Sequence, residues 1–396
     1  MTGKINYPLA SSTWDDAELR AINAVIESGM FTMGANVRAF EQEFANYVGA
    51  KHAVMVNSGS SANLLGVQAM LYAEGPNKVR PGDAVIVPAI GWSTTYFPLH
   101  QSGLNMVFVD VDPKTYNLDI DEVRKAAAMP GVKAILAVNL LGRACPFDEL
   151  KAICDEHNLV LMEDNCEGFG ADYKGRKTGT FGAFGSFSFF FSHHLVTMEG
   201  GMVVTDDAEL YSNLLCMRAH GWTRELPDDS HLHIDAPAFT KKFRFALPGF
   251  NLRPLEMSGA IGLEQLKKAD GMIETRRANA RAFFETFKDC KYVELPAFDE
   301  DCSWFGYGLV VKGLTPVQRD ALAGKLAENN IESRPVLTGN FLKNPAIKHL
   351  DYKAASDMKH ADIIDDSGLF FGAHNHGLEN EFKAVRAIIE DFCGAL

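Results

Sequence analysis

The sequence has few cysteines, no long apolar stretch and no internal repeat. Its seven cysteines are scattered over 396 residues without a C-x-x-C pair, as expected of free thiols in a reducing compartment. No stretch approaches the ~18 consecutive apolar residues of a membrane span, and the N-terminal residues show no signal-peptide pattern. We therefore expect a cytoplasmic protein that does not cross a membrane.

Basic residues are also in the minority. There are 38 lysines and arginines against 51 aspartates and glutamates, so the net charge is −13 at pH 7. Such a charge argues against nucleic acid and anionic membrane surfaces as partners. An anionic small-molecule substrate stays compatible with it, because the local field of a pocket differs from the total charge.

What the sequence does have is an alternation of short β-branched runs and helical stretches. The strand-like runs cover residues 52–56, 84–88, 106–111, 134–139, 159–163, 184–191 and 202–205. The helical stretches between them include 60–73, 121–128, 147–157 and 209–220. This alternation predicts an α/β fold with a mainly parallel, seven-stranded sheet flanked by helices.

The last third of the chain contains fewer elements. A long helical pattern at 255–290 is followed by a strand near 304–311 and by helices near 316–329 and 379–392. We predict a large domain at 1–260, including an N-terminal arm, and a linking helix with a small α+β domain at 261–396.

A turn of small residues, Asn57 to Asn63, connects the first predicted strand to the helix after it. The N-terminus of a helix presents free N–H groups and the positive end of the helix dipole, which suits a phosphate group. A plain helix cap would use the same residue types. Both interpretations therefore stay open for Gly59, Ser60 and Ser61.

Two other predicted strands are followed by residues that suit a cofactor. Trp92 follows the run at 84–88 and is either a core residue or a flat ring against a ligand. Asp164 follows the run at 159–163. It either caps the next helix or places a carboxylate opposite a cofactor's ring nitrogen.

The apolar run around Ser188 leads to Ser192, His193 and His194, and a Gly-Gly step follows at 200–201. An imidazole can move protons near neutral pH, but it can equally be a hydrogen-bonded group behind the sheet. No carboxylate or cysteine lies at metal-ligand spacing around the two histidines, so we expect no metal site.

Together these motifs resemble the DegT/DnrJ/EryC1/StrS family of sugar-nucleotide aminotransferases, from about residue 10 to the end. That family has a Ser-Gly-(Thr/Ser)-x-Ala loop, a Glu-Asp pair after a strand, and a Ser-Phe segment leading to a lysine and a Gly-Glu-Gly-Gly run. The resemblance implies the type I fold of enzymes that use pyridoxal 5′-phosphate (PLP). It implies PLP-binding roles for Gly59, Ser60, Ser61 and Ser188 at the phosphate, Trp92 against the ring, Asp164 at the pyridine nitrogen and Glu167 near the ring hydroxyl.

His193 stands where the family has the lysine that bonds PLP. A histidine cannot hold PLP covalently but can act as a base, and Ser192-His193 matches the pair found in the family's 3-dehydratases. These enzymes act on nucleotide-linked 4-keto-6-deoxy sugars. The resemblance thus makes His193 the catalytic base, supported by Ser192, with His194 structural.

The resemblance to this dehydratase branch also implies a substrate and a course of reaction. The substrate would be GDP-4-keto-6-deoxy-D-mannose, which loses its C3 hydroxyl on the way to a colitose-type 3,6-dideoxysugar of O-antigen. L-glutamate would convert PLP to pyridoxamine 5′-phosphate (PMP), and ammonia would be released. No iron–sulfur cluster is expected, because the family's cluster-bearing dehydratases carry a tight cysteine group that this chain lacks.

The resemblance further implies a homodimer with shared active sites. The family's Gly-x-Asn-x-Arg run places an asparagine, here Asn251, at the phosphate of the neighbouring subunit, and His220 lies in an Arg-x-His-Gly turn that would help order the site. Two alternatives stay open. One is an aminotransferase that works without its lysine and makes a 4-amino sugar. The other is a non-catalytic regulatory protein that kept the fold.

Overall fold

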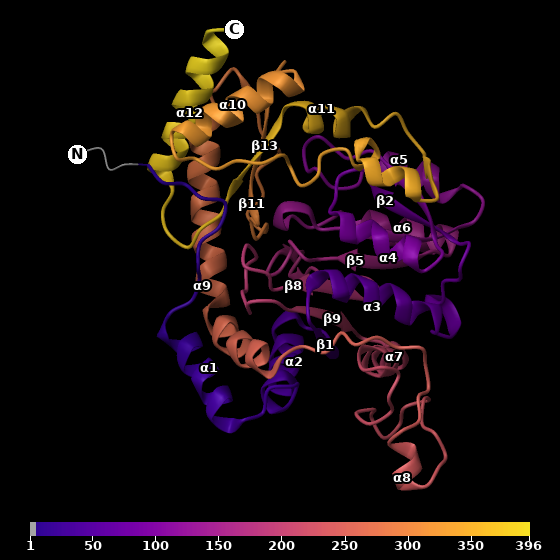
Figure 1. Cartoon of the computed structure of the whole chain (residues 1–396). Coiled ribbons are helices and arrows are strands. Elements are labelled where there is room, and N and C mark those ends of the chain that lie inside the picture. Colours follow the sequence, from indigo (N-terminus) through magenta and orange to yellow (C-terminus); the bar gives the residue numbers. More distant parts are fainter. Residues whose placement is uncertain (1–4) are drawn as a thin grey trace.

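A mostly parallel sheet of eight strands forms the centre of the computed structural model, which describes residues 5–396 (Figure 1). Its order is β1-β9-β8-β5-β4-β2-β3-β12, and β9 runs antiparallel to both of its neighbours. Its central strands are buried along their whole length, as expected of strands covered on both faces. The strands are β1 (His52–Val56), β2 (Ala84–Pro88), β3 (Asn105–Val109), β4 (Val132–Val138), β5 (Val160–Asp164), β8 (Gly185–Ser188), β9 (Gly201–Thr205) and β12 (Tyr352–Ala354).

The sheet agrees with the predicted fold class but differs from it in two details. An eighth strand, β12, is added at the edge by the C-terminal third of the chain, where it pairs in parallel with β3. In addition, β8 ends at Ser188 and not at residue 191. The Phe189 N–H donates to the Gly200 carbonyl (2.9 Å) and the His193 N–H to the Phe190 carbonyl (2.9 Å), so the chain folds into a loop there. This loop carries both histidines.

Helices follow the strands of the large lobe and cover the sheet (Figure 1). Four of them were predicted to within a few residues, and the exception is α4, which holds Pro98 in its interior. They are α3 (Gly59–Leu71), α4 (Ser93–Gln101), α5 (Ile120–Ala127), α6 (Phe147–His157) and α7 (Ala208–Arg218). The small elements between strands are β6 (Asp172–Tyr173), β7 (Arg176–Lys177) and the 3-10 turns Gly75–Asn77 and Leu140–Gly142.

Two helices that were not predicted precede β1. The first, α1 (Asp16–Ser28), begins with a capping box in which the Asp15 carboxylate accepts from the Ala17 N–H (2.7 Å) and Glu18 accepts from the Asp15 N–H (2.8 Å). The second, α2 (Ala35–Val48), lies against the long helix α9 (Glu256–Phe287). A Cβ at Gly262 of α9 would stand 2.5 Å from the Phe40 ring, so glycine is what lets these two helices approach.

A second core lies around the C-terminal half of α9. It is built on an antiparallel sheet in the order β10-β11-β13, and Phe283 and Tyr307 stack near its centre. Tyr7 joins this core from the N-terminal arm and donates to the Gly372 carbonyl (2.7 Å). The remaining elements are β10 (Val293–Glu294), β11 (Gly306–Val311), β13 (Gly368–Gly372), α10 (Pro316–Glu328), α11 (Lys359–Ser367), α12 (Glu379–Gly394) and the turns Phe341–Lys343 and Pro345–His349.

The domain division at residue 260 stays a prediction. Helix α9 begins before that residue, and its side chains enter both the core around α2 and the second core. Side chains from the C-terminal third, such as Val336 and Phe341, also belong to the main core. The two lobes therefore share elements more than a single boundary suggests.

An excursion between α7 and α9, residues 221–253, extends away from the body of the molecule and carries the short helix α8 (Ala238–Lys241) (Figure 1). Three of its phenylalanines are largely exposed, Phe239 (80%), Phe243 (60%) and Phe245 (56%). Over residues 5–396, no helix combines the length and the apolar character needed to cross a membrane.

Candidate active site

A cavity of about 380 Å³ opens at the carboxyl ends of the parallel strands, where open α/β sheets bind their ligands. Several of the residues predicted for the site line it together, although they come from four different loops. They are Gly59, Ser60, Trp92, Asp164, Glu167, Ser188, Ser192 and His193. The other predicted residues, Ser61, His220 and Asn251, do not line this cavity.

The first turn of α3 forms one end of the cavity. Ser58 caps this helix, and its Oγ accepts from the Ser61 N–H (3.1 Å). Next to it, an added Cβ on Gly59 would lie 2.4 Å from Ser188 Cβ, so only glycine lets the helix approach the end of β8 so closely. Ser60 Oγ donates to Thr94 Oγ1 (2.8 Å). The result is a polar cradle at a helix N-terminus.

The contact of Ser61 with a phosphate stays a prediction, although two of its polar groups already have partners within the helix cap. Its N–H is used by the helix cap, and its Oγ accepts from Ser58 Oγ (3.0 Å). The first turn of a helix has several free N–H groups, and the cap consumes one of them. Here the consumed N–H belongs to Ser61, which leaves the Ser61 hydroxyl as its remaining donor.

Asp164, the last residue of β5, is held rigidly at the cavity. It is 5% exposed, and its Oδ2 accepts from Asn63 Nδ2 (2.9 Å) and Thr95 Oγ1 (2.7 Å). The Cys166 N–H donates to Oδ1 (3.2 Å). A buried carboxylate fixed in this way is suited to face a protonated ring nitrogen.

Glu167 also reaches the cavity, where its environment favours the protonated form. Its Oε2 accepts from the N–H of Leu141 (2.9 Å), a residue in left-handed backbone conformation (φ 55°). Burial raises the pKa of Glu167 to about 7, with Arg334 opposing the rise and Asp164 adding to it. Glu167 therefore titrates in the neutral range.

The imidazole of His193 lies in the loop after β8 with its ring in the cavity. Its Nδ1 is enclosed and has no hydrogen-bond partner in residues 5–396, which leaves Nε2 to meet a ligand. Burial lowers the pKa of His193 to about 3, and the positive charges of Arg334 and Arg276 lower it further. At neutral pH the ring is an uncharged imidazole that can accept a proton.

His194 points away from the cavity, in agreement with the structural role predicted for it. It is 1% exposed, and its Nε2 lies 3.1 Å from the Ser303 carbonyl oxygen. Burial lowers its pKa well below the usual range, and Arg276 adds to the effect. His194 thus fastens the loop after β8 to the segment that enters β11.

His220 and Asn251 lie together, but away from this chain's cavity. The His220 N–H donates to the Phe250 carbonyl (2.6 Å), and its ring meets Trp222 at a centroid distance of 4.8 Å. Asn251 is exposed, and its Oδ1 accepts from Arg253 Nε (3.0 Å). Neither His220 nor Asn251 is among the residues that line the cavity.

Among the site residues that the sequence analysis missed are Asn63, Thr95, Phe305 and Arg334. Asn63 and Thr95 hold Asp164, and each follows a predicted site residue by three or four positions, a helical spacing that would have placed them nearby. Phe305 and Arg334 line the cavity from the C-terminal third of the chain. No motif near either of them signals this position.

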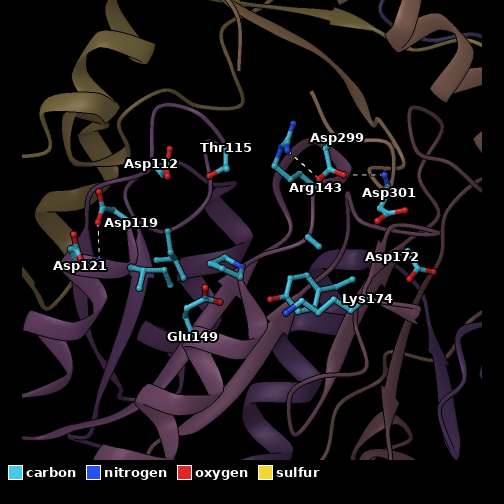
Figure 2. A pocket seen from close by; sticks show the side chains of 15 residues that line it. Asp112, Thr115, Asp119, Asp121, Arg143, Glu149, Asp172, Lys174, Asp299 and Asp301 are labelled. Carbon is cyan, nitrogen blue, oxygen red and sulfur yellow. Dashed lines mark hydrogen bonds and ion pairs between the residues drawn. The ribbon is translucent and has the colours of Figure 1, made fainter. Parts of the chain in front are cut away.

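A second cavity, of about 610 Å³, lies elsewhere and has a different character (Figure 2). It contains none of the predicted site residues. Its lining has seven carboxylates against the two basic residues Arg143 and Lys174, and Arg143 pairs with Asp299 (3.1 Å). Carboxylates on the wall repel a phosphate group. No group of side chains in the described part of the chain could hold a metal ion. The cofactor is therefore to be sought in the first cavity.

Comparison with known proteins gives a match to the DegT/DnrJ/EryC1/StrS aminotransferase family over residues 12–390. The chain belongs to this family. GDP-4-keto-6-deoxy-D-mannose 3-dehydratase of Yersinia pseudotuberculosis is 51% identical over 389 residues, which are 98% of either protein. A family member of known structure, the E. coli GDP-4-keto-6-deoxy-D-mannose-3-dehydratase with bound hydrated PLP, is 48% identical, with a TM-score of 0.92 over 97% of this chain and 99% of that one.

A further structure of this type, GDP-4-keto-6-deoxymannose-3-dehydratase with a trapped PLP-glutamate geminal diamine, is 47% identical. It has a TM-score of 0.93 over 97% of this chain and 100% of the other. These likenesses confirm the predicted family and the type I fold.

The residues of the first cavity fit the cofactor that this family uses. The cradle at the start of α3 suits a phosphate group, and the fixed Asp164 suits a pyridine nitrogen. Trp92 lines the cavity with its side chain half exposed, so its indole is free to cover a flat ring. No lysine is among the lining residues of residues 5–396, so nothing here would bond PLP covalently.

Proposed function

We propose that this protein is a PLP- and PMP-dependent 3-dehydratase of a nucleotide-linked 4-keto-6-deoxy sugar. The substrate would be GDP-4-keto-6-deoxy-D-mannose, the amino donor L-glutamate, and the products the 3-deoxy ketosugar and ammonia. One observation carries the proposal. His193 occupies the family's lysine position, and its neutral ring shares the cavity with Asp164 and Ser188.

The chain's own residues would hold the cofactor and move one proton. The bound cofactor supplies an amino group for the sugar's 4-keto carbon and a ring that absorbs negative charge. Asp164 keeps the ring nitrogen protonated, while the first turn of α3 and Ser188 hold the phosphate. Trp92 covers the ring, and Glu167 stands near its hydroxyl.

His193 would act first as base and then as acid. With PMP and the ketosugar bound, Nε2 of His193 would accept a proton at the reacting carbon and return it to the C3 oxygen of the sugar, which would leave as water. An imidazole of low pKa gives up an acquired proton readily, which favours the second step. Its enclosed Nδ1 leaves a single nitrogen for both transfers.

Product analysis tests the proposal against its rivals. The protein is incubated with PLP, L-glutamate and GDP-4-keto-6-deoxy-D-mannose, and the products are identified by mass spectrometry together with an ammonia assay. A 3-deoxy ketosugar with ammonia supports the proposal. A 4-amino sugar makes the protein an aminotransferase. No change in cofactor absorbance on adding PLP and glutamate would indicate a non-catalytic protein. A panel of other nucleotide sugars tests the choice of GDP.

We further propose a homodimer in which Asn251 serves the phosphate in the partner's cavity. Two features support it: Asn251 is exposed and does not line its own chain's cavity, and the excursion at 221–253 exposes Phe239, Phe243 and Phe245. Exposed aromatic clusters of this kind mark protein interfaces. Light scattering combined with assay at nanomolar protein tests the dimer, and a fully active monomer would overturn it.

We also place the reaction in the cytoplasm, as a step toward a colitose-type sugar of O-antigen. The described residues hold seven free cysteines, in keeping with a reducing compartment. Cell fractionation with an antibody against the protein tests the location. Loss of a 3,6-dideoxysugar from the lipopolysaccharide of a deletion strain tests the end product.

A further inference from the structure

Arg334 places a guanidinium with no polar partner at the wall of the active-site cavity. It follows α10 in the chain, and its backbone is fixed by two hydrogen bonds with Phe370 (3.1 and 2.8 Å). The guanidinium lies over the Phe370 ring at 4.3 Å from the centroid. Within residues 5–396, no side-chain hydrogen bond or ion pair involves it, and its Nε is fully enclosed. Its position is therefore set by the fold and not by a counterion.

A cation in this setting calls for an anionic ligand. Removing a guanidinium from water is costly unless a hydrogen-bonded anion replaces the water. Burial lowers the pKa of Arg334 while Glu167 opposes the change, yet arginine stays charged. Glu167 does not pair with it within 4 Å, because the Glu167 carboxylate instead accepts from the Leu141 N–H. The four N–H donors on the two terminal nitrogens of Arg334 thus remain free for a ligand, while its Nε stays enclosed.

Among residues 5–396, no other arginine or lysine lines the cavity. Its lining otherwise includes the acidic residues Asp164, Glu167 and Glu199 and the neutral His193. An anionic substrate that enters the cavity therefore meets one arginine among several carboxylates. The planar guanidinium fork suits the two oxygens of a carboxylate.

We infer that Arg334 binds a carboxylate of the amino donor, a dicarboxylic amino acid. The inference rests on the proposed use of glutamate by this site. The donor's amino group must react at the point served by His193, and its carboxylates lie within a few bonds of that group. Arg334 lines the same cavity as His193, and its charge lowers the pKa of that ring. A residue that binds the donor's carboxylate has to lie this close to His193. The cofactor's phosphate has its own cradle at α3, so it does not compete for Arg334.

Glutarate, which has both carboxylates of glutamate but no amino group, tests the inference without chemistry. Its affinity is measured by calorimetry on the PLP-loaded protein, for the parent chain and for Arg334→Gln and Arg334→Lys. We expect Arg334→Gln to weaken glutarate binding about 10- to 100-fold, as loss of a charged bidentate contact predicts. Arg334→Lys should recover part of the loss, because it keeps the charge but not the fork.

A second measurement follows the reaction of bound PLP with glutamate through the cofactor's absorbance, with no sugar present. Arg334→Gln should raise the glutamate concentration needed for half-maximal rate by a similar factor, while the affinity for PLP stays unchanged. Glutamine as donor shows which carboxylate is bound, because it keeps the α-carboxylate and lacks the side-chain one. If Arg334 binds the α-carboxylate, Arg334→Gln should lower the rate with glutamine as well. If Arg334 binds the side-chain carboxylate, the rate with glutamine should be the same in Arg334→Gln and the parent chain. Arg277→Gln is the matched control, because Arg277 donates to the carbonyls of Asp301 and Cys302 and does not line the cavity.

The outcomes separate this inference from the proposed function. Glutarate affinity that is equal in Arg334→Gln and the parent chain overturns the inference. If Arg334→Gln weakens only the binding of GDP, the inference is also overturned, because Arg334 would then bind the nucleotide phosphates. If the sugar product is a 4-amino sugar, the proposed dehydration fails but the glutarate result still decides the role of Arg334.

Discussion

The ring of Phe305 meets the imidazole of His193 nearly edge-on, with centroids 5.0 Å apart and an angle of 63° between the planes. Phe305 reaches this position from the segment before β11, where its N–H donates to the Leu141 carbonyl (2.9 Å). Buried Arg276 donates to the carbonyls of Trp304 (3.0 Å) and Phe305 (3.3 Å). Since Nδ1 of His193 has no partner, packing by Phe305 is what orients the ring.

Replacing Phe305 with leucine should therefore impair catalysis more than folding. We expect the dehydration rate to fall roughly 10- to 100-fold, because a displaced base loses its geometry. The free energy of unfolding should change by less than about 2 kcal/mol. Rates and urea unfolding measured side by side check this. Phe181→Leu, which alters an aromatic stack with Phe147 outside the cavity, is the control and should leave the rate unchanged.

Removing the imidazole should abolish deoxygenation while PLP still binds. In His193→Asn the contacts of Asp164, Ser188 and α3 are untouched, so cofactor affinity should persist. The loss of a general base predicts a rate at least ~100-fold lower. Ammonia release with glutamate and the ketosugar measures it, with the exposed His349→Asn as control. An unchanged rate in His193→Asn would move the role of base to another histidine.

The cofactor should not be linked covalently to the parent protein. Borohydride reduction followed by intact mass should show no added cofactor, since no lysine lines the cavity. Converting Ser192-His193 to Asn-Lys should produce a stable adduct after reduction and shift the products toward an amino sugar. A stable adduct in the parent protein would contradict noncovalent binding of PLP.

Acid should destabilise the fold through its two buried histidines. Burial lowers the pKa of His193 to about 3 and that of His194 well below its usual value, whereas in the unfolded chain both lie near 6.5. The unfolded state therefore takes up more protons below pH 6.5, and stability falls as the pH drops from 6.5 toward 3. His193 accounts for about 2 kcal/mol of this loss at pH 5, and His194 adds to it in the same direction.

Urea unfolding at pH 7.5 and pH 5 measures this loss. His193→Asn should lose about 2 kcal/mol less than the parent chain over the same interval. The exposed His349→Asn again serves as control. Equal losses in His193→Asn and the parent would mean that the His193 ring is not held uncharged.

The sequence alone was informative wherever the site is local. Asp164, Ser188 and the start of α3 each lie at a strand end, and strand ends of a parallel sheet meet at one edge. The same logic failed for Phe305 and Arg334, which are brought in by the second lobe more than 100 residues after His193. Their position depends on how that lobe packs, and no short pattern records it.

The missed helices at the N-terminus are a different case. Asp15 and Glu18 form a capping box at the start of α1, and Gly29 ends the helix in left-handed conformation (φ 70°). Both ends of α1 could therefore have been predicted from the sequence. The loop after β8 was missed because its sequence gives a misleading signal. Its phenylalanines continue the strand pattern beyond Ser188, although Phe190 and Phe191 are about half exposed. An apolar run thus predicted a strand where the chain turns.

Helix α9 links the two cores through one continuous backbone, about 48 Å long. Ala269, Met272 and Ile273 pack beside α2, while Ala280, Phe283 and Phe287 enter the second core. If either core unfolded, the half of α9 that packs in it would lose its contacts. The other half of the helix, and the core around it, would then be exposed to water. The protein should therefore unfold on heating in a single cooperative transition. The loop after β8 and Arg334 should stay together until the whole chain unfolds.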